Sequence, residues 1–175
     1  MTMEWSTRRI VITAAAGIFL VCLPFIFCSS WCLDKIQDWA TANPTASGAA
    51  AWQYRVGWVY LNTLRQDKGA TAYYRYLDKF TPPATPPENP TDQERQRYQD
   101  LVQRHGNAMY MYGLCLDEWS NSIVGAVGEG ENRKTAVEIR TMAKAVYDAF
   151  LERYPEHPDA AVARRAAERL MIQIR

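Results

Sequence analysis

The sequence contains few of the residues on which metal binding and acid–base catalysis depend. Its 175 residues include only two histidines and four cysteines. His105 and His157 have no cysteine or carboxylate at metal-ligand spacing, so we expect surface or capping roles for both rather than a metal site or a catalytic base. No C-x-x-C pair is present, which excludes the usual patterns of zinc ribbons and c-type haem attachment. The cysteines are therefore expected to be buried, inert thiols.

Other chemical motifs are missing as well. The glycine run at residues 125–130 lacks the Lys-Ser/Thr ending of a phosphate-binding loop, and no strand-like segment precedes it. Asp117 and Glu118 are adjacent, so on a helix their side chains point about 100° apart and do not form a catalytic pair. We therefore expect a protein that is not an enzyme, with no cofactor, no metal and no small-molecule substrate.

An excess of charge of either sign is also missing. The chain has 20 basic and 19 acidic side chains, a formal net charge of +1. Proteins that bind nucleic acid usually carry a basic face, so the composition argues against a nucleic-acid partner. Beyond residue 33 the balance is 18 basic to 18 acidic side chains, which leaves no net field to attract a polyanion.

One segment of the chain lacks charge altogether. Residues 10–33 form an uncharged run of 24 residues, most of them apolar, and about 20 apolar residues are enough to cross the hydrocarbon core as a helix. Trp5 and Trp31 bracket the run at a spacing suited to the two headgroup regions. Pro24 introduces a kink that membrane helices tolerate. The pattern predicts a transmembrane helix over residues 10–33.

The flanks of this segment predict its orientation. Arg8 and Arg9 stand directly before the run, and basic flanking residues stay on the cytoplasmic side. Residues 1–9 are therefore expected in the cytoplasm and the remainder of the chain in the periplasm, as in a single-pass protein of the inner membrane. A cleaved signal peptide is the alternative interpretation. The apolar run exceeds the usual length of about 7–15 residues, however, and no A-x-A site follows at the right distance.

Turn residues divide the part of the chain after the predicted span. Residues 34–48 are expected to be a juxtamembrane segment and linker, with a short helix-like stretch at 35–41. Prolines predict a stiff loop at 81–90, and three glycines predict a second loop at 120–132. No sustained strand alternation is present, so an all-α domain is expected over 49–175. Helical patterns occupy residues 49–67, 70–80, 91–119 (with Thr91 and Glu94 as a capping box), 133–153 and 159–175.

An internal repeat is the most informative pattern in this domain. Residues 73–80 match residues 147–154, which lie 74 positions later. In both copies a tyrosine is followed by an aromatic residue, a leucine and a final aromatic residue at spacings of 3, 1 and 3. Such spacing places all four side chains on one stripe of a helix. The four positions are Tyr73, Tyr76, Leu77 and Phe80 in the first copy and Tyr147, Phe150, Leu151 and Tyr154 in the second.

The repeated units resemble tetratricopeptide repeats, which are stacked antiparallel helical hairpins. The first unit carries Val56-Gly57, Tyr60, Gly69, Tyr73, Tyr76 and Pro82; the second carries Tyr112-Gly113, Ala143, Tyr147, Phe150 and Pro155, with an insertion of about 18 residues. The resemblance implies a packing role for Gly57, Tyr60, Tyr73, Tyr76, Leu77, Ala143, Tyr147, Phe150, Leu151 and Pro155. It also implies a capping last helix, with Ala163, Ala167, Leu170 and Ile174 inward and Arg164, Arg165, Arg169 and Arg175 outward.

A second aromatic cluster suggests contact with other protein. Large apolar side chains surround one expected helix, and residues of these types are enriched at interfaces. They are Met109, Tyr110, Met111, Tyr112 and Trp119. We therefore expect a non-enzymatic accessory or scaffold subunit that docks on an integral membrane complex of the respiratory, photosynthetic or envelope type, with the lipid bilayer around its anchor. An envelope adaptor that binds peptides in a helical groove is the alternative.

Overall fold

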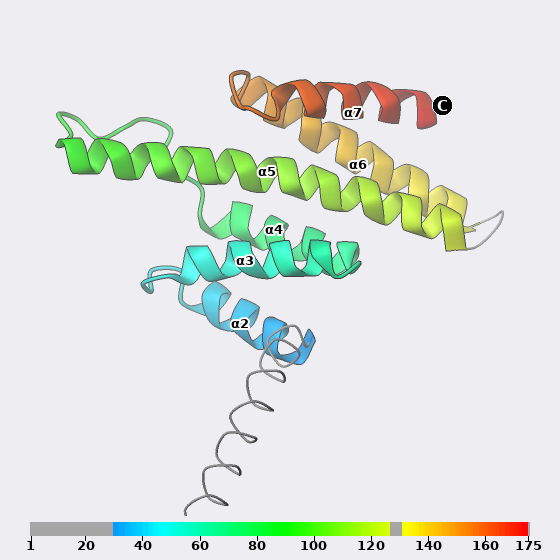
Figure 1. Cartoon of the computed structure of the whole chain (residues 1–175), viewed down its shortest axis with the longest axis horizontal. Coiled ribbons are helices and arrows are strands. Elements are labelled where there is room, and N and C mark those ends of the chain that lie inside the picture. Colours follow the sequence, from blue (N-terminus) through cyan, green and yellow to red (C-terminus); the bar gives the residue numbers. More distant parts are fainter. Residues whose placement is uncertain (1–29, 127–130, 175) are drawn as a thin grey trace, which may run out of the picture.

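The computed structural model describes residues 30–126 and 131–174, and all regular structure in these ranges is helical. The expected all-α fold is therefore confirmed for the described part of the chain. Its helices are α2 (Ser30–Ala42), α3 (Ala49–Asn62), α4 (Gln66–Lys79), α5 (Asp92–Ala126), α6 (Glu131–Arg153) and α7 (Ala160–Gln173). Each helix packs chiefly on the next one along the chain, so the chain climbs from α2 at the bottom of Figure 1 to α7 at the top.

The predicted membrane segment lies almost wholly outside the described residues. Trp5, Arg8, Arg9 and Pro24 all fall there, so their assigned roles stay predictions. Among residues 30–126 and 131–174, no helix combines the length and the apolar content needed to cross a bilayer. The last four residues of the predicted span, 30–33, are described. They form the first turn of α2, whose Leu33 is buried against the helical domain.

The two hairpins α3–α4 and α5–α6 repeat the same contacts. In the first, a Cβ added to Gly57 would come within 2.9 Å of the Tyr73 ring; in the second, a Cβ added to Gly113 would come within 2.8 Å of the Tyr147 ring. Only glycine permits this approach of helix and ring. The offset between the hairpins is 56 residues for the first helix and 74 for the second, which reproduces the expected insertion of 18 residues.

Aromatic rings around these glycines repeat as well. The Tyr54 ring lies edge-on to Tyr73 and Tyr76, with centroids 5.5 and 5.8 Å away. At the equivalent position, Tyr110 lies 6.2 Å from Tyr147 and 5.9 Å from Phe150. The residues expected to pack the repeats are mostly part of this core. Gly57, Tyr60, Tyr73, Tyr76, Ala143, Tyr147 and Phe150 are buried, Leu77 and Leu151 are partly buried, and Pro155 is exposed in the turn after α6.

The break in the first hairpin occurs earlier than predicted. The sequence suggested helices at 49–67 and 70–80 separated by Gly69, but α3 ends at Asn62 and α4 begins at Gln66. Leu64 adopts a left-handed φ of 59°, and the Arg65 backbone N–H donates to the Tyr60 carbonyl, which closes the helix end. Gly69 lies inside α4, where an added Cβ would come within 2.9 Å of Cys115 Sγ. Gly69 therefore allows close packing against Cys115 and does not form the turn between α3 and α4.

The glycine-rich loop predicted at 120–132 is also wrong in extent. Helix α5 continues to Ala126 and α6 begins at Glu131, so the insertion lengthens both helices of the second hairpin. Ile123 packs on the core, and Ala136 and Ile139 are buried beside it. Burial of this kind outweighs the helix penalty of a glycine, which is about 1 kcal/mol.

The other predicted features, namely the proline-rich loop, the capping box and the buried face of the last helix, are present in the structure. The proline-rich loop at 81–90 has no regular structure. At the start of α5 the backbone N–H of Thr91 donates to a Glu94 carboxylate oxygen at 2.9 Å, and the Glu94 N–H donates back to Thr91 Oγ1 at 3.3 Å. This is the expected capping box. On α7, Ala163, Ala167 and Leu170 are buried as expected, and Ile174 is partly buried.

Candidate interaction site

Helix α2 is packed onto the hairpin rather than separated from it by a linker. Its buried face carries Leu33, which contacts a small apolar cluster with Val56, Tyr60 and Ala72 of α3 and α4. Ala40 is buried on the same face. The predicted linker of residues 34–48 is therefore reduced to the turn at residues 43–48 between α2 and α3. That turn is itself ordered by hydrogen bonds from the backbone N–H groups of Ala46 and Ala49.

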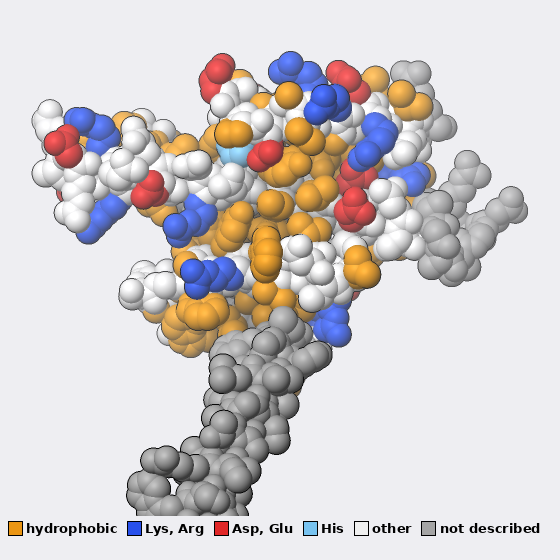
Figure 2. Space-filling view, viewed as in Figure 1, with side chains coloured by type: hydrophobic (Ala, Val, Ile, Leu, Met, Phe, Trp, Pro, Cys, Tyr) orange, Lys and Arg blue, Asp and Glu red, His pale blue; other side chains and the backbone are white. Residues whose placement is uncertain are grey.

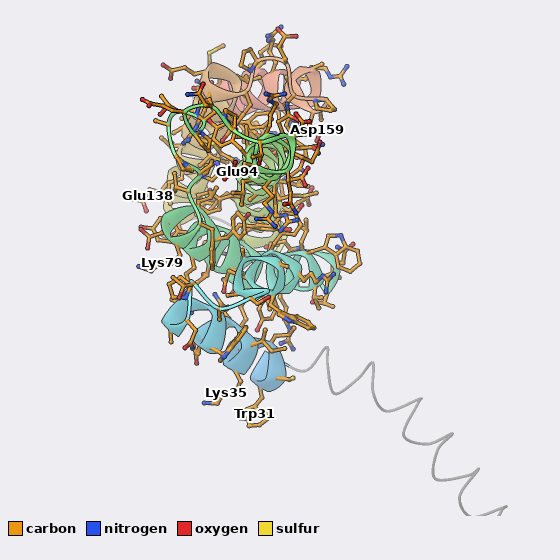
Figure 3. The ribbon with its side chains drawn as sticks, turned by 90° about the vertical axis from the view of Figure 1, so that its left-hand side faces the viewer. Trp31, Lys35, Lys79, Glu94, Glu138 and Asp159 are labelled. Atoms are coloured by element: carbon orange, nitrogen blue, oxygen red, sulfur yellow. The ribbon has the colours of Figure 1, made fainter. Side chains whose placement is uncertain are left out.

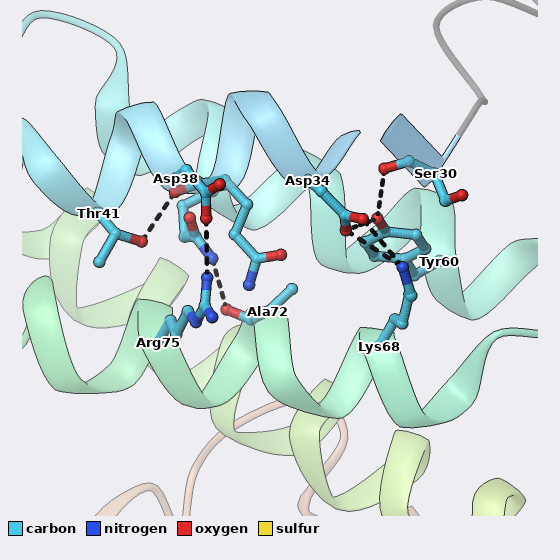
Figure 4. A network of polar contacts seen from close by, with 10 residues as sticks. Ser30, Asp34, Asp38, Thr41, Tyr60, Lys68, Ala72 and Arg75 are labelled. Carbon is cyan, nitrogen blue, oxygen red and sulfur yellow. Dashed lines mark hydrogen bonds and ion pairs between the residues drawn. The ribbon is translucent and has the colours of Figure 1, made fainter. Parts of the chain in front are cut away.

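A polar network ties the start of α2 to both helices of the first hairpin (Figure 4). The Tyr60 hydroxyl donates to Asp34 Oδ1 at 2.5 Å, and Lys68 Nζ lies 3.0 Å from Asp34 Oδ2. Burial by itself would raise the pKa of Asp34, but the hydrogen bonds from Tyr60 and Lys68 and the lysine charge together lower it. Burial and the neighbouring Asp34 raise the pKa of Tyr60. Asp34 is thus a carboxylate and Tyr60 a hydroxyl donor at neutral pH.

Further contacts hold the middle of α2 and the hairpin below it. Arg75 of α4 forms an ion pair with Asp38 at 3.5 Å, and Figure 4 shows it alongside the Asp34 network. The buried Gln53 amide donates to the Ala72 carbonyl at 2.9 Å and fastens α3 to α4. These polar contacts at two successive turns of α2 add to the apolar packing that attaches α2 to the hairpin.

The predicted interface residues of α5 are largely used inside the fold. Each of them is partly buried and packs on the core, namely Met109, Tyr110, Met111, Tyr112 and Trp119. Tyr112 also lies 6.1 Å from the ring of the exposed Tyr74. What stays accessible is one edge of the cluster, where Tyr112, Trp119 and Met142 line a shallow hollow of about 420 Å³.

A second, more polar hollow lies between α3 and α5. It measures about 300 Å³ and is lined by Tyr54, Asp100, Gln103, Arg104 and Asn107. Tyr54 comes from the first hairpin and the other four from α5. Apolar side chains form a band across the face of the molecule seen in Figure 2, between α3 and α7.

The surface role expected for His105 is wrong. His105 is 4% exposed, and its Nδ1 lies 2.7 Å from the Tyr154 hydroxyl. Burial, with a smaller contribution from the nearby Arg153 charge, lowers the pKa of His105 to about 4. The ring is therefore neutral at pH 7, and the hydrogen bond joins α5 to the end of α6.

His157 has the capping role allowed by the sequence but is also largely buried. Its side chain is 6% exposed. Its Nδ1 accepts from the Asp159 backbone N–H at 3.2 Å, just before α7 begins, and its Nε2 donates to Asn107 Oδ1 at 2.9 Å. The turn between α6 and α7 is thereby fixed to α5.

Sequence reasoning missed an ion pair between α5 and α7 in which the acidic partner is buried. Asp117 is 2% exposed, and its carboxylate pairs with Arg169, whose side chain is 54% exposed and points outward as expected. Burial raises the pKa of Asp117, although the Arg169 charge and hydrogen bond oppose that rise. The signal that could have revealed it is the position of Asp117, which falls on the apolar stripe and corresponds to Leu61 in the first hairpin.

Of the two cysteines that the structure describes, Cys115 is buried and Cys32 is partly exposed. Burial raises the pKa of the Cys115 thiol to about 12, so it is a poor nucleophile at neutral pH. The described residues contain no cluster of three side chains able to hold a metal ion. Comparison with known protein families, characterised proteins and solved structures finds no match.

Proposed function

We propose that this chain is a membrane-anchored, non-enzymatic scaffold subunit of a larger membrane protein complex. The observation that carries the proposal is the packing of α2, because this helix contains the last four residues of the predicted span and is joined to the domain by the Asp34–Tyr60–Lys68 network. A domain held in this way keeps a set height and orientation above the membrane. Bracing the extrinsic part of a neighbouring protein requires such a fixed position, whereas an adaptor on a flexible tether does not.

The repeated hairpins support an interaction role. Two hairpins with equivalent contacts, closed by α7, form the kind of stacked array that tetratricopeptide-like proteins use to contact other proteins. We infer that the domain is tetratricopeptide-like and exported to the periplasm, with residues 1–9 in the cytoplasm and residues 10–33 as the anchor in the inner membrane. The partners are an integral membrane complex and the lipid around the anchor.

A peptide-binding adaptor is the second candidate, and the hollow beside Tyr54 and Arg104 favours it. The two functions differ in what they require. An adaptor needs the hollow but no set position above the membrane. A scaffold needs the set position, and substitutions in the hollow leave its partner bound. Arg104→Ala in the full chain therefore releases the partner of an adaptor and retains that of a scaffold.

Gentle solubilisation of the source membranes tests the proposal directly. The full chain is expected to co-purify with larger membrane proteins at fixed stoichiometry. A monodisperse monomer with no partner would contradict the scaffold function.

A pair of insertions tests the requirement for rigidity. A flexible Gly-Ser segment placed immediately before Ser30 separates α2 and the domain from residues 10–29 of the predicted span, and we expect it to abolish co-purification of the complex. The matched control places the same segment between Pro44 and Thr45, in the turn where α2 already stays attached through its own contacts. This control should retain the complex. Equal retention by both variants would contradict rigid bracing.

A further inference from the structure

The outer face of α2 is unusually apolar for a surface helix. Trp31, Lys35 and Trp39 recur every four residues and therefore lie on one stripe. Trp31 is 72% exposed and Trp39 is 42% exposed. Figure 3 shows Trp31 and Lys35 projecting from α2 away from the rest of the fold. The two indoles are about 12 Å apart along the helix axis, so the stripe runs along α2 rather than marking one point.

A third tryptophan from α3 completes this surface. Trp52 is 40% exposed, and together with the α2 stripe and Ile36 it lines an open hollow of about 360 Å³. We call the surface formed by Trp31, Lys35, Ile36, Trp39 and Trp52 the tryptophan face. Because α2 packs on α3, the three backbone positions that carry these indoles lie on one face of the helix pair. Tryptophan concentrates where a protein meets the headgroup region of a bilayer, since its ring is apolar and its N–H is polar.

Charges around α2 are sorted between its two sides. The acidic residues Asp34 and Asp38 are directed to α4, where they pair with Lys68 and Arg75. The basic residue Lys35 lies on the tryptophan face. Arg55 of α3 extends the basic character, because its guanidinium lies 5.5 Å from the centre of the Trp52 ring. The face therefore presents indoles and positive charge, which suits anionic phospholipid headgroups.

The chain itself leads to this face. The uncharged run of residues 10–33 overlaps the first turn of α2 and includes Trp31. The tryptophan face thus begins where the predicted span ends, so the end of a spanning helix would bring it to the membrane surface without a linker.

We propose that the tryptophan face rests in the headgroup region of the bilayer, so that α2 lies along the membrane surface and sets the orientation of the helical domain. This inference rests on the proposed membrane anchor. It goes beyond that anchor by assigning a lipid contact to Trp39 and Trp52, which are outside the predicted span. A protein partner on the same face is the competing occupant.

The test uses the full chain reconstituted alone in vesicles of phosphatidylcholine and phosphatidylglycerol. Lipids brominated on the acyl carbons nearest the headgroup quench tryptophan emission at that depth, and acrylamide quenches tryptophan exposed to water. Trp39→Phe and Trp52→Phe should each remove part of the emission quenched by brominated lipid. Trp58→Phe is the matched control, since Trp58 is 52% exposed on α3 but does not line the face. It should remove emission quenched by acrylamide instead.

Alkaline carbonate extraction of the same vesicles separates this inference from the anchor. If the chain resists extraction while acrylamide alone quenches Trp39 and Trp52, the anchor stands and the tryptophan face does not touch lipid. If brominated lipid quenches Trp39 and Trp52 but carbonate releases the chain, the docking stands and the anchor is contradicted. Resistance to extraction together with quenching by brominated lipid supports both.

Discussion

The hairpins α3–α4 and α5–α6 share one packing scheme but differ in length and in what they bury. Both place a glycine against a tyrosine ring and a further tyrosine beside it. The helices of the first hairpin have 14 residues each, whereas those of the second have 35 and 23. The shared contacts therefore give both hairpins the same packing. The added length leaves the N-terminal part of α5 exposed and lengthens the part of α5 that pairs with α6.

The second hairpin also buries ionisable groups where the first buries apolar ones. His105 corresponds to Ala49, and Asp117 corresponds to Leu61. The first hairpin instead has its polar network on the side that packs against α2, where the Tyr60 hydroxyl donates to Asp34. One packing scheme therefore serves two purposes: the first hairpin binds α2, and the second binds α7 and carries the buried groups His105 and Asp117.

The largest expected effect on stability comes from removing the buried tyrosine ring that faces the glycine of each hairpin. Tyr73→Ala and Tyr147→Ala each leave a cavity in a fully buried site, and we expect each to lower the free energy of unfolding by about 3–5 kcal/mol. Chemical denaturation of the full chain in detergent measures both. Tyr74→Ala is the control, because Tyr74 is exposed, and it should cost about 1 kcal/mol or less. A large loss for only one of the two buried tyrosines would break the equivalence of the hairpins.

Acid should destabilise the protein through the second hairpin. The folded-state pKa of His105 is about 4, below its ordinary value of 6.5. The unfolded chain therefore binds the proton more readily, so this contribution to stability is complete above about pH 6.5 and is lost as the pH falls toward 4. The loss is on the order of 3 kcal/mol. Denaturation midpoints measured across that range should fall with acidity in the wild type and much less in His105→Gln.

Asp117 and Asp34 provide the controls for this pH dependence. The raised pKa of Asp117 acts in the opposite direction, because the folded state then holds its proton more strongly than the unfolded state. Asp117→Asn should therefore steepen the acid loss. The lowered pKa of Asp34 matters only below its ordinary value of 3.8, outside the range of His105. An unchanged slope in His105→Gln would refute the assignment to this histidine.

Removing single tyrosine hydroxyls should affect stability differently at the contact with α2 and in the core of the two hairpins. Tyr60→Phe removes a hydrogen bond to the charged Asp34, and we expect a loss of about 1.5–3 kcal/mol. The hydroxyls of Tyr73 and Tyr76 are buried without a hydrogen-bond partner among the described residues. Replacing either by phenylalanine should be neutral or stabilising by up to about 1 kcal/mol. Thermal unfolding of the three single variants compares them, and equal losses would contradict the proposed junction.

The smallest expected effect concerns the paired glycines. A Cβ at Gly57 or Gly113 forces the facing ring to move, at a cost of about 1–3 kcal/mol, while alanine recovers up to about 1 kcal/mol of helix propensity. We expect a net loss of about 0–2 kcal/mol for each alanine variant, similar in the two hairpins. Adding Tyr73→Leu to Gly57→Ala should relieve the clash, and the double variant should lose less than the two single changes combined.

Local patterns in the sequence predicted most of the fold. The aromatic stripe, the capping box at Thr91 and the length of the insertion depend on neighbouring residues or on self-similarity, and all appear in the structure. The failures arose where tertiary packing outweighs propensity. Gly69 suggested a break but serves a close contact with Cys115, and α5 continues past Gly125 to Ala126.

The candidate site was harder to predict because its residues are far apart in the sequence. Asp34 meets Tyr60 and Lys68 across 26 and 34 residues, and no periodicity links them. The aromatic residues of α5 were predicted as an interface from composition alone, yet the core receives most of their surface. Trp31 and Trp39 share one stripe of α2, but Trp52 joins them only because α2 folds onto α3.

Hydrogen–deuterium exchange of the full chain reconstituted in vesicles tests the central claim, which is that α2 is part of the helical domain. We predict that the α2 amides between Leu33 and Ala42 are protected to the same degree as those of α3 and α4. Asp34→Asn should reduce this protection in α2 while α5–α7 stay unchanged. Rapid exchange throughout α2 beside a protected α3–α7 would show a flexible tether and contradict the account.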